Sequence, residues 1–342
     1  MQAEIDLAEA FMWEKLQRTL KAAQSAQSAL DIRRQIFGST SVQVAEAEVA
    51  LSQIFLSESK LPQSLELAEH AWAITAPQDP ASDIRLRAGL ALTRTMSMMR
   101  KAESAEKLAR DLCSILRMIE ATNPLQSRVT NALGYELLLQ GRTSEALVWL
   151  RAAVDSSRSA QGISNAERAN FVANLGVALL NLDRPRDALP FFEEAARRFA
   201  VEKVIPAQAS ALLSAGTAAD RAGDRARGLE LREQGASLLA KLPEQHPLTF
   251  ALNRFKIAQS YVHAGRLEEA EATASEAAKA IAGMRPPTHF QALNSRISLG
   301  WIKARRGRAA EGLADVRDAF RASIAVNNSL EVSQNRVVGV ID

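Results

Sequence analysis

An apolar residue followed by a small residue recurs along the chain in one fixed frame, at intervals of 40 to 42 residues. Eight copies share the small residue, which is Ala10, Ser52, Thr93, Gly134, Gly176, Gly216, Ala258 or Gly300. The apolar residue before it is clearest in Leu51, Leu92, Leu133, Leu175, Ile257 and Leu299. A second small residue follows after twelve positions, as Ala22, Ser64, Ala105, Ala146, Ala188, Gly228, Ala270 and Gly312. A third small residue follows seven positions after the second, as Ala29, Ala71, Ala153, Ala195, Gly235, Ala277 and Ala319. Only copy three departs from this rule, with Leu112 at the third position. This register indicates an internal repeat.

Each copy predicts two helices packed against each other. Helices approach closely only where a side chain is nearly absent, and larger side chains one turn away fill the grooves beside the contact. The turn inside a copy is marked by residues that suit a helix end or a helix start: Gly141, Pro185, Gly223, Gly265 and Gly307. Helix breakers also separate successive copies, among them Gly38, Pro77, Pro124, Gly162, Pro206, Pro247 and Pro286. The sequence therefore predicts an all-α chain of eight antiparallel helical hairpins.

One hairpin alone has too little apolar surface to offset the entropy of ordering it, so neighbouring copies must stack. This requirement predicts one continuous array over residues 1–328, with no boundary in the middle of the chain. Residues 329–342 contain Leu330, Val332 and Val338 in a helix-like pattern. We expect this end to form a capping helix or the start of a further copy.

The repeat resembles the tetratricopeptide repeat. Copy four carries the signature most clearly, at Leu133, Gly134, Leu137, Gly141, Ala146, Leu150 and Ala153. The first junction, with Leu30, Phe37-Gly38 and Val44-Ala45, is similar to the 42-residue repeats of kinesin light chain and its bacterial relatives. Copies six and eight depart from the pattern, because Arg232 and Lys303 stand where apolar residues are expected. The resemblance implies a right-handed superhelical solenoid.

In proteins of this kind the first helix of each hairpin lines a concave face that binds a segment of a partner. The polar and aromatic residues that we expect on this face are Arg128, Asn131, Tyr135, Asn170, Asn174, Asn181, Thr217, Arg221, Lys256, Gln259, His263 and Trp301. The resemblance implies that Asn131 and Asn174 hold a peptide backbone, since an amide side chain both donates and accepts hydrogen bonds. The alternative is that these residues simply solvate a helical face.

Composition excludes several classes of protein. Among 342 residues, 47% are apolar, and 42 Lys and Arg stand against 39 Asp and Glu. This small basic surplus makes nucleic acid an unlikely partner. The single cysteine, Cys113, excludes an intramolecular disulfide, and its apolar neighbours predict a buried, inert thiol. No apolar stretch is long enough to span a bilayer and the first residues do not resemble a secretion signal, so we expect a cytoplasmic protein.

Catalytic and cofactor motifs are absent from the sequence. The four histidines show no metal-ligand spacing, and no phosphate-binding loop, dinucleotide fingerprint or nucleophile elbow is present. We therefore expect no enzyme activity, no cofactor and no metal.

Three functions remain open. The first is a non-enzymatic scaffold that binds a partner protein or peptide on the concave face. The second is a regulatory arm of a larger effector, because bacterial relatives often precede a CHAT-type protease or a transcription activator. The third is RNA binding along the groove, for which Lys303, Arg305, Arg306 and Arg308 form a candidate cluster. The attraction of cations to the last carbonyls of a helix is the favoured explanation of that cluster.

Overall fold

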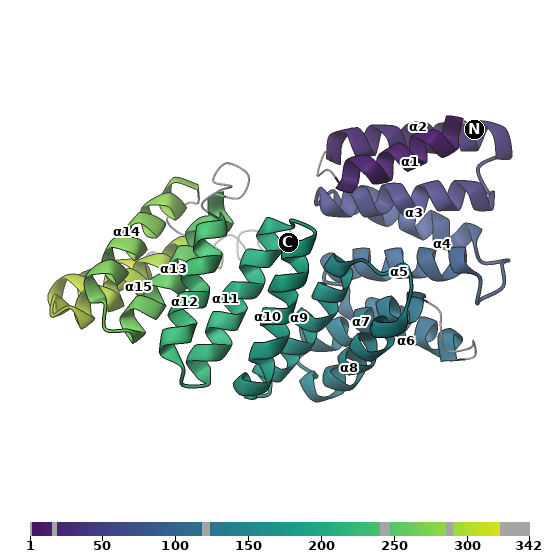
Figure 1. Ribbon diagram of the computed structural model, residues 1–342. Helices are drawn as coiled ribbons and strands as arrows, with labels where there is room; N and C mark the ends of the chain where they lie inside the picture. The colour runs from purple at the N-terminus through teal and green to yellow at the C-terminus, as the bar shows by residue number, and fades with distance from the viewer. Residues whose placement is uncertain (1, 16–18, 118–123, 240–246, 285–289, 322–342) are drawn as a thin grey trace, which may run out of the picture. The chain divides into compact units, whose positions relative to one another are not determined.

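The computed structural model describes residues 2–15, 19–117, 124–239, 247–284 and 290–321, and this part of the chain is helical without any strand. Figure 1 shows the helices following one another as antiparallel neighbours. Their bounds are α1 (Gln2–Lys15), α2 (Thr19–Phe37), α3 (Val42–Ser57), α4 (Leu61–Ile74), α5 (Asp83–Met98), α6 (Ala102–Arg117), α7 (Pro124–Leu139), α8 (Thr143–Ser159), α9 (Asn165–Asn181), α10 (Pro185–Val201), α11 (Ile205–Arg221), α12 (Arg225–Leu239), α13 (Pro247–His263), α14 (Leu267–Met284) and α15 (Phe290–Arg305). Residues 309–321 are also helical.

Within each of the two units described below, consecutive helices pair as the repeat frame predicts, which confirms the all-α class and the helical hairpins. The contacts divide the chain into a first unit, residues 1–182, and a second unit, residues 183–342. Helices α1 to α9 belong to the first unit, and α10 to α15 belong to the second. The continuous superhelical array over residues 1–328 stays a prediction, and residues 329–342 lie outside the described part of the chain.

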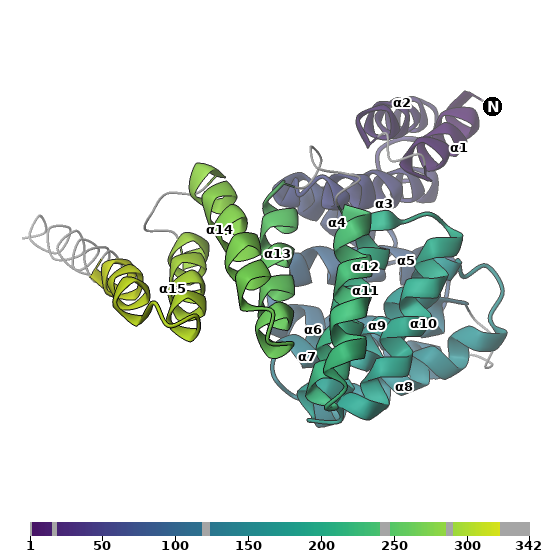
Figure 2. The ribbon, with the colours of Figure 1, turned by 60° about the vertical axis from the view of Figure 1, so that its left-hand side comes forward.

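The first helices of successive hairpins form an inner layer within each unit. Helix α3 contacts α5, α5 contacts α7, and α7 contacts α9. In the second unit α11 contacts α13, and α13 contacts α15. Figure 2 shows α13 and α14 side by side, and α14 also packs against α15. The inner layer brings side chains from copies about 40 residues apart next to one another.

Every residue at the three small positions is buried, including Leu112. The closeness of the helices explains why. A Cβ atom added to Gly134 would lie 2.6 Å from Cγ of Leu150 on the facing helix. In the second hairpin the Ser64 hydroxyl donates to the backbone carbonyl of Ser52 at 2.8 Å, which joins the first two small positions directly. The structure thus confirms the close helix contact predicted from the frame.

In each copy, the size of the first small residue is matched to that of the residue four positions after the second small residue. Where the first is glycine, the other is large, in the pairs Gly134 with Leu150, Gly176 with Phe192, Gly216 with Arg232 and Gly300 with Val316. Where the first is alanine, serine or threonine, the other is alanine, in the pairs Ala10 with Ala26, Ser52 with Ala68, Thr93 with Ala109 and Ala258 with Ala274. An added Cβ would lie 2.6 Å from Cγ of Leu150 at Gly134, 2.6 Å from Cγ of Arg232 at Gly216 and 3.0 Å from Cγ2 of Val316 at Gly300, so in these three pairs the match reflects direct packing.

The turns inside the hairpins place one residue in the left-handed region. The four predicted glycines have positive φ: Gly141, Gly223, Gly265 and Gly307. Three residues with side chains, Ser59, Arg100 and Asp183, adopt the same conformation in other copies, with φ of 59°, 59° and 57°. In copy four the turn is closed by hydrogen bonds from Arg142 N to Leu137 O at 2.9 Å and from Gly141 N to Leu138 O at 3.0 Å.

Candidate functional site

The inner layer of the first unit contains a pocket of about 420 Å³. It is formed by α3, α5, α7 and α9, the first helices of four successive hairpins. Its lining residues are Leu56, Thr93, Arg94, Ser97, Met98, Asn131, Ala132, Tyr135, Glu136, Glu167, Asn170, Phe171 and Asn174. A pocket of this size with apolar walls and a few polar groups is typical of a ligand site.

Four of the predicted residues meet in this pocket. Asn131 and Tyr135 come from α7, and Asn170 and Asn174 come from α9. The Asn174 side-chain amide donates to Oδ1 of Asn131 at 3.0 Å. This hydrogen bond fixes the orientation of both amides and leaves each with further donor or acceptor capacity. Asn181 is exposed at the end of α9 and does not line the pocket.

Arg128 lies beside the pocket and orders its wall. Its guanidinium binds both carboxylate oxygens of Glu167, at 2.7 and 3.0 Å, and the carbonyl oxygen of Gly162 at 3.1 Å. Glu167 in turn caps α9, because its carboxylate accepts from Ser164 N while the Ser164 hydroxyl accepts from Glu167 N, each at 3.1 Å. Burial raises the pKa of Glu167, but the hydrogen bonds and charge of Arg128 prevail and lower it overall. Arg128 therefore positions α9, a role that the sequence analysis did not assign.

Arg94 and Glu136 are among the pocket residues that the sequence analysis missed. Arg94 follows the first small residue, Thr93, just as Tyr135 follows Gly134, so the repeat frame contained the signal for it. Glu136 follows Tyr135 and gives no such signal. An acidic side chain on a helix is normally solvated, whereas this residue is only 1% exposed.

The charges of these two residues are incompletely compensated. Within the described residues Arg94 makes no hydrogen bond or ion pair. Burial lowers the pKa of Arg94, the Glu167 carboxylate raises it and the Arg128 charge lowers it. Burial raises the pKa of Glu136, the Ser97 hydroxyl opposes this by hydrogen bonding, and the charge of Glu106 adds to it. Oε2 of Glu136 is buried without a hydrogen-bond partner.

In the second unit, predicted residues surround a buried ion pair. Arg232 of α12 binds Asp220 of α11, and their side chains are 6% and 8% exposed. The Thr217 hydroxyl accepts from Arg232 at 3.3 Å and donates to the Leu213 carbonyl at 3.0 Å. Nδ1 of His263 lies 3.5 Å from Oδ2 of Asp220. These contacts are internal to the fold.

The remaining predicted residues are more scattered. Arg221 binds Asp183 at 2.8 Å and Gln259 is exposed. Trp301 is 46% exposed, and the Arg305 guanidinium lies 5.4 Å from the centre of its indole ring. The side chain of Lys256 lies outside the described part of the structure.

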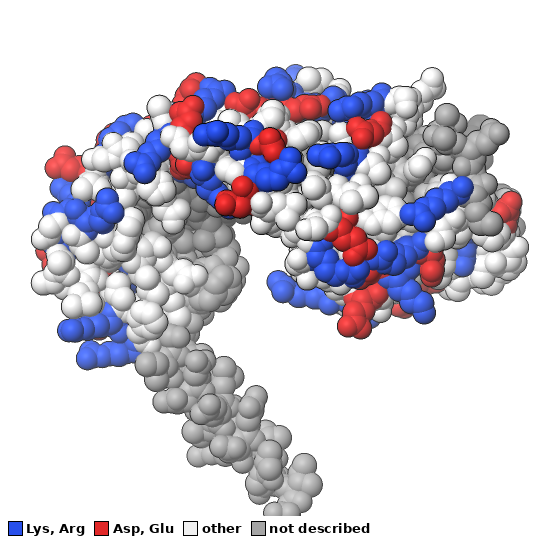
Figure 3. Space-filling model, turned by 90° about the horizontal axis from the view of Figure 1, so that it is seen from below, with Lys and Arg blue, Asp and Glu red and all other residues white. Residues whose placement is uncertain are grey.

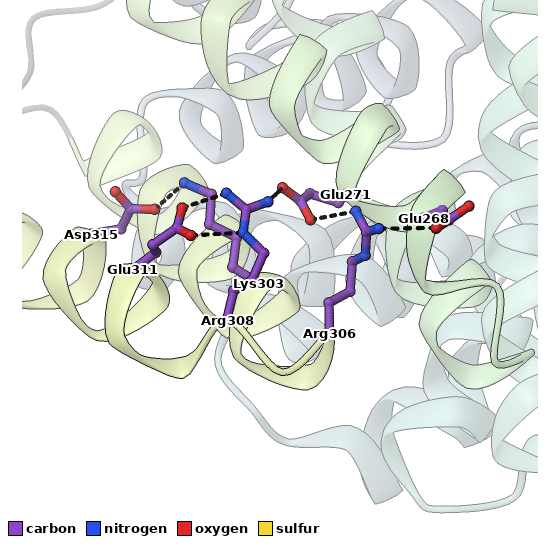
Figure 4. A network of polar contacts seen from close by, with 7 residues as sticks. All are labelled: Glu268, Glu271, Lys303, Arg306, Arg308, Glu311 and Asp315. Atoms are coloured by element: carbon purple, nitrogen blue, oxygen red, sulfur yellow. Dashed lines mark hydrogen bonds and ion pairs between the residues drawn. The ribbon is translucent and has the colours of Figure 1, made fainter.

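The basic cluster of the last copy is engaged within the chain (Figure 4). Lys303 binds Asp315 at 2.7 Å, and Arg306 binds Glu271 at 2.8 Å and Glu268 at 3.1 Å. Arg308 binds Glu271 at 2.6 Å and also pairs with Glu311. On the face shown in Figure 3, basic and acidic side chains intermingle. These observations favour a structural role for the cluster over the capture of RNA phosphates.

The thiol of Cys113, the single cysteine, is buried as the sequence predicts. Cys113 is 4% exposed, and burial raises the pKa of its thiol to about 12 although Arg117 and Arg110 oppose the shift. Such a thiol is a poor nucleophile.

The described residues include no group of three or more His, Cys, Asp or Glu side chains arranged to hold a metal ion. Among the described helices, none has the length and apolar character needed to cross a membrane.

Comparisons with known proteins agree with the fold. A family model of the tetratricopeptide repeat matches residues 258–276. No curated protein sequence matches the chain significantly. Among solved structures, the chain is similar to PH0952 of Pyrococcus horikoshii, a signal transduction ATPase with a tetratricopeptide repeat sensor. The TM-score is 0.70 at 13% identity, and the match covers 99% of this chain but only 50% of the longer ATPase.

Two further solved structures have the same fold. A Rap protein complexed with competence and sporulation factor matches with a TM-score of 0.61 and 12% identity, over 86% of this chain and 80% of its own. BtubC (BKLC) from P. vanneervenii matches with a TM-score of 0.54 and 18% identity, over 70% of this chain and 92% of its own. At these identities the likeness concerns the fold, which is that of tetratricopeptide-repeat-like solenoids.

Proposed function

We propose that this protein is a non-enzymatic interaction scaffold or sensor, which binds a peptide or a segment of a partner protein in the inner layer of its first unit. The observation that carries the proposal is the pocket in which Asn131, Tyr135, Asn170 and Asn174 converge from two helices. Paired amides suit a peptide backbone, which presents alternating donors and acceptors. The apolar side chains of Leu56, Met98 and Phe171 offer a place for one ligand side chain. The similar Rap protein has been solved with competence and sporulation factor, which supports this kind of ligand.

A displayed library of random peptides provides a direct test. Peptides selected on the wild-type protein should bind at least tenfold more weakly to the variant Asn131→Ala with Asn174→Ala, because several hydrogen bonds to the backbone are lost. Asn181→Ala is the matched control, since this asparagine lies on α9 but outside the pocket lining. Equal affinity of all three proteins for the selected peptides would place the binding surface elsewhere, and failure to select any peptide would contradict the proposal.

A second candidate is a sensor arm of a larger effector. It is favoured by PH0952, a signal transduction ATPase with a tetratricopeptide repeat sensor, half of which matches almost all of this chain. The reading frame of the gene tests this candidate. An effector domain after Asp342 would support it, and a stop codon directly after this residue would remove it.

A further inference from the structure

The pocket of the first unit is lined by two groups of opposite charge, the partly exposed Arg94 and the buried Glu136, that the chain itself leaves incompletely satisfied. Arg94 on α5 has no hydrogen-bond or ion-pair partner within the described residues. Glu136 on α7 is 1% exposed, and its Oε2 has no hydrogen-bond partner. Both line the pocket but do not pair with each other. A buried carboxylate is normally paired, and an arginine in a pocket wall without a protein partner is free to bind an anion.

A ligand with two charged ends provides that explanation. Resting on the proposed function, we propose that the pocket binds a compact zwitterion, of amino-acid to tripeptide size, whose carboxylate is held by Arg94 and whose ammonium group is held by Glu136. A carboxylate fits the fork of guanidinium donors, and an ammonium group offers the Glu136 carboxylate a partner of opposite charge. The pocket volume of about 420 Å³ lies in the range of small-ligand sites and limits the size of the ligand.

The remaining walls indicate which side chain such a ligand carries. Leu56, Met98, Ala132 and Phe171 give the pocket an apolar surface. The amides of Asn131 and Asn170 line the same pocket and can bind the peptide groups of such a ligand. Leucine, methionine and phenylalanine, and the dipeptides and tripeptides built from them, therefore match the pocket in charge and in polarity.

The test uses these amino acids and peptides as probes, each in a free, an N-acetylated and a C-amidated form. Binding is measured by isothermal titration calorimetry. On the wild-type protein, blocking either end should weaken the binding of the favoured probe about tenfold or more, which is the effect of one charge-assisted hydrogen-bonded contact. Comparison of the free amino acids, dipeptides and tripeptides shows which ligand length the pocket prefers.

Two variants assign each end of the ligand to its residue. Arg94→Gln should bind the free and the amidated probe equally, while it still discriminates against acetylation. Glu136→Gln should show the reverse selectivity. Asn181→Ala, outside the pocket, should behave as wild type. Circular dichroism and thermal unfolding establish that each variant is folded.

Three results would overturn the inference. They are the absence of binding by any free probe at 10 mM or below, equal binding of free and blocked probes, and evidence that the two residues pair internally. In the last case Arg94→Gln and Glu136→Gln would each destabilise the protein, and the double variant would be no less stable than either. Loss of zwitterion binding alone does not affect the proposed peptide scaffold, because displayed peptides test that function through Asn131 and Asn174.

Discussion

Two sets of oppositely charged residues, one in each unit, are arranged in opposite ways. In the second unit Arg232 and Asp220 occupy the place that apolar side chains fill elsewhere, and they bind each other across the α11–α12 hairpin. In the first unit Arg94 and Glu136 lie in one pocket without pairing. The difference separates charges that hold the fold together from charges that are available to a ligand. Removing a charge should therefore change stability in opposite directions at these two places.

The hairpin with the ion pair also shows how the repeat tolerates charge. Arg232 corresponds in the frame to Leu150 of copy four, and both pack against a glycine. A Cβ added to Gly228 would lie 2.0 Å from Oδ1 of Asp220, so the second glycine of this copy makes room for the carboxylate. The departure that the sequence analysis noted at Arg232 is thus a matched replacement, in which two glycines accommodate an ion pair.

Breaking the ion pair should have the largest effect. Arg232→Ala leaves the Asp220 carboxylate buried without its partner and should lower the free energy of unfolding by about 3 to 5 kcal/mol. Replacing both residues by leucine restores an apolar contact and should cost far less, or stabilise the protein. Urea unfolding followed by circular dichroism measures both variants. If the single and the double variants were equally destabilised, the pair would have no structural role.

Disturbing the size match between the first small residue and the residue that packs against it should have the second-largest effect on stability. Gly134→Ala forces a methyl group against Leu150 and should cost about 1 to 3 kcal/mol. In combination with Leu150→Ala, which alone should cost about 2 to 5 kcal/mol, the cost should fall well below the sum, because the pair then resembles Thr93 with Ala109. Gly283→Ala is the control, since an added Cβ meets no atom within 4 Å there. Additive costs at 134 and 150 would contradict the match.

Removing the charge of Glu136 in the pocket should change the free energy of unfolding less, and in the opposite direction. Burial raises the pKa of Glu136, so the folded state binds its proton more tightly than the unfolded state does. The stability supplied by the neutral carboxyl is present at low pH and is lost as the pH rises through the raised pKa. Glu136→Gln should therefore stabilise the protein at pH 7 by about 1 kcal/mol, with the gain disappearing towards pH 4. Thermal unfolding across this pH range measures it, and destabilisation at pH 7 would show that Glu136 is structural.

The smallest effect is expected in a turn. Arg100 is exposed and has a φ of 59°, in the place where copy four has Gly141. Arg100→Gly relieves the left-handed conformation but gives the unfolded chain more freedom, so the net gain should be about 0.5 kcal/mol. The reverse change, Gly141→Arg, should destabilise the protein. The two variants are compared by their midpoints of thermal unfolding. Equal midpoints would mean that the turns at Arg100 and Gly141 are not equivalent.

Sequence reasoning predicted the hairpins because size and spacing are local. Close helix contact requires small residues at set intervals, and the turn glycines mark the helix ends. Ser59 and Arg100 could not be recognised as turn residues, since nothing in their chemistry requires the left-handed conformation that the hairpin imposes on them.

The candidate site was predictable in part. Asn131, Tyr135, Asn170 and Asn174 lie on inward-facing positions, and the helical period is enough to find them. Glu136 was out of reach, because its burial arises from neighbouring helices that are distant in sequence. The ion pairs of Arg128 and Arg221 were equally hidden, since their partners depend on how each helix packs on the next.

Hydrogen–deuterium exchange with a peptide selected from the displayed library tests the location of the binding site most directly. The account predicts that the bound peptide slows exchange in the segments around residues 93–98, 131–136 and 167–174, while α12 and α14 exchange as in the free protein. Protection confined to the second unit, or to the second helices of the hairpins, would contradict it.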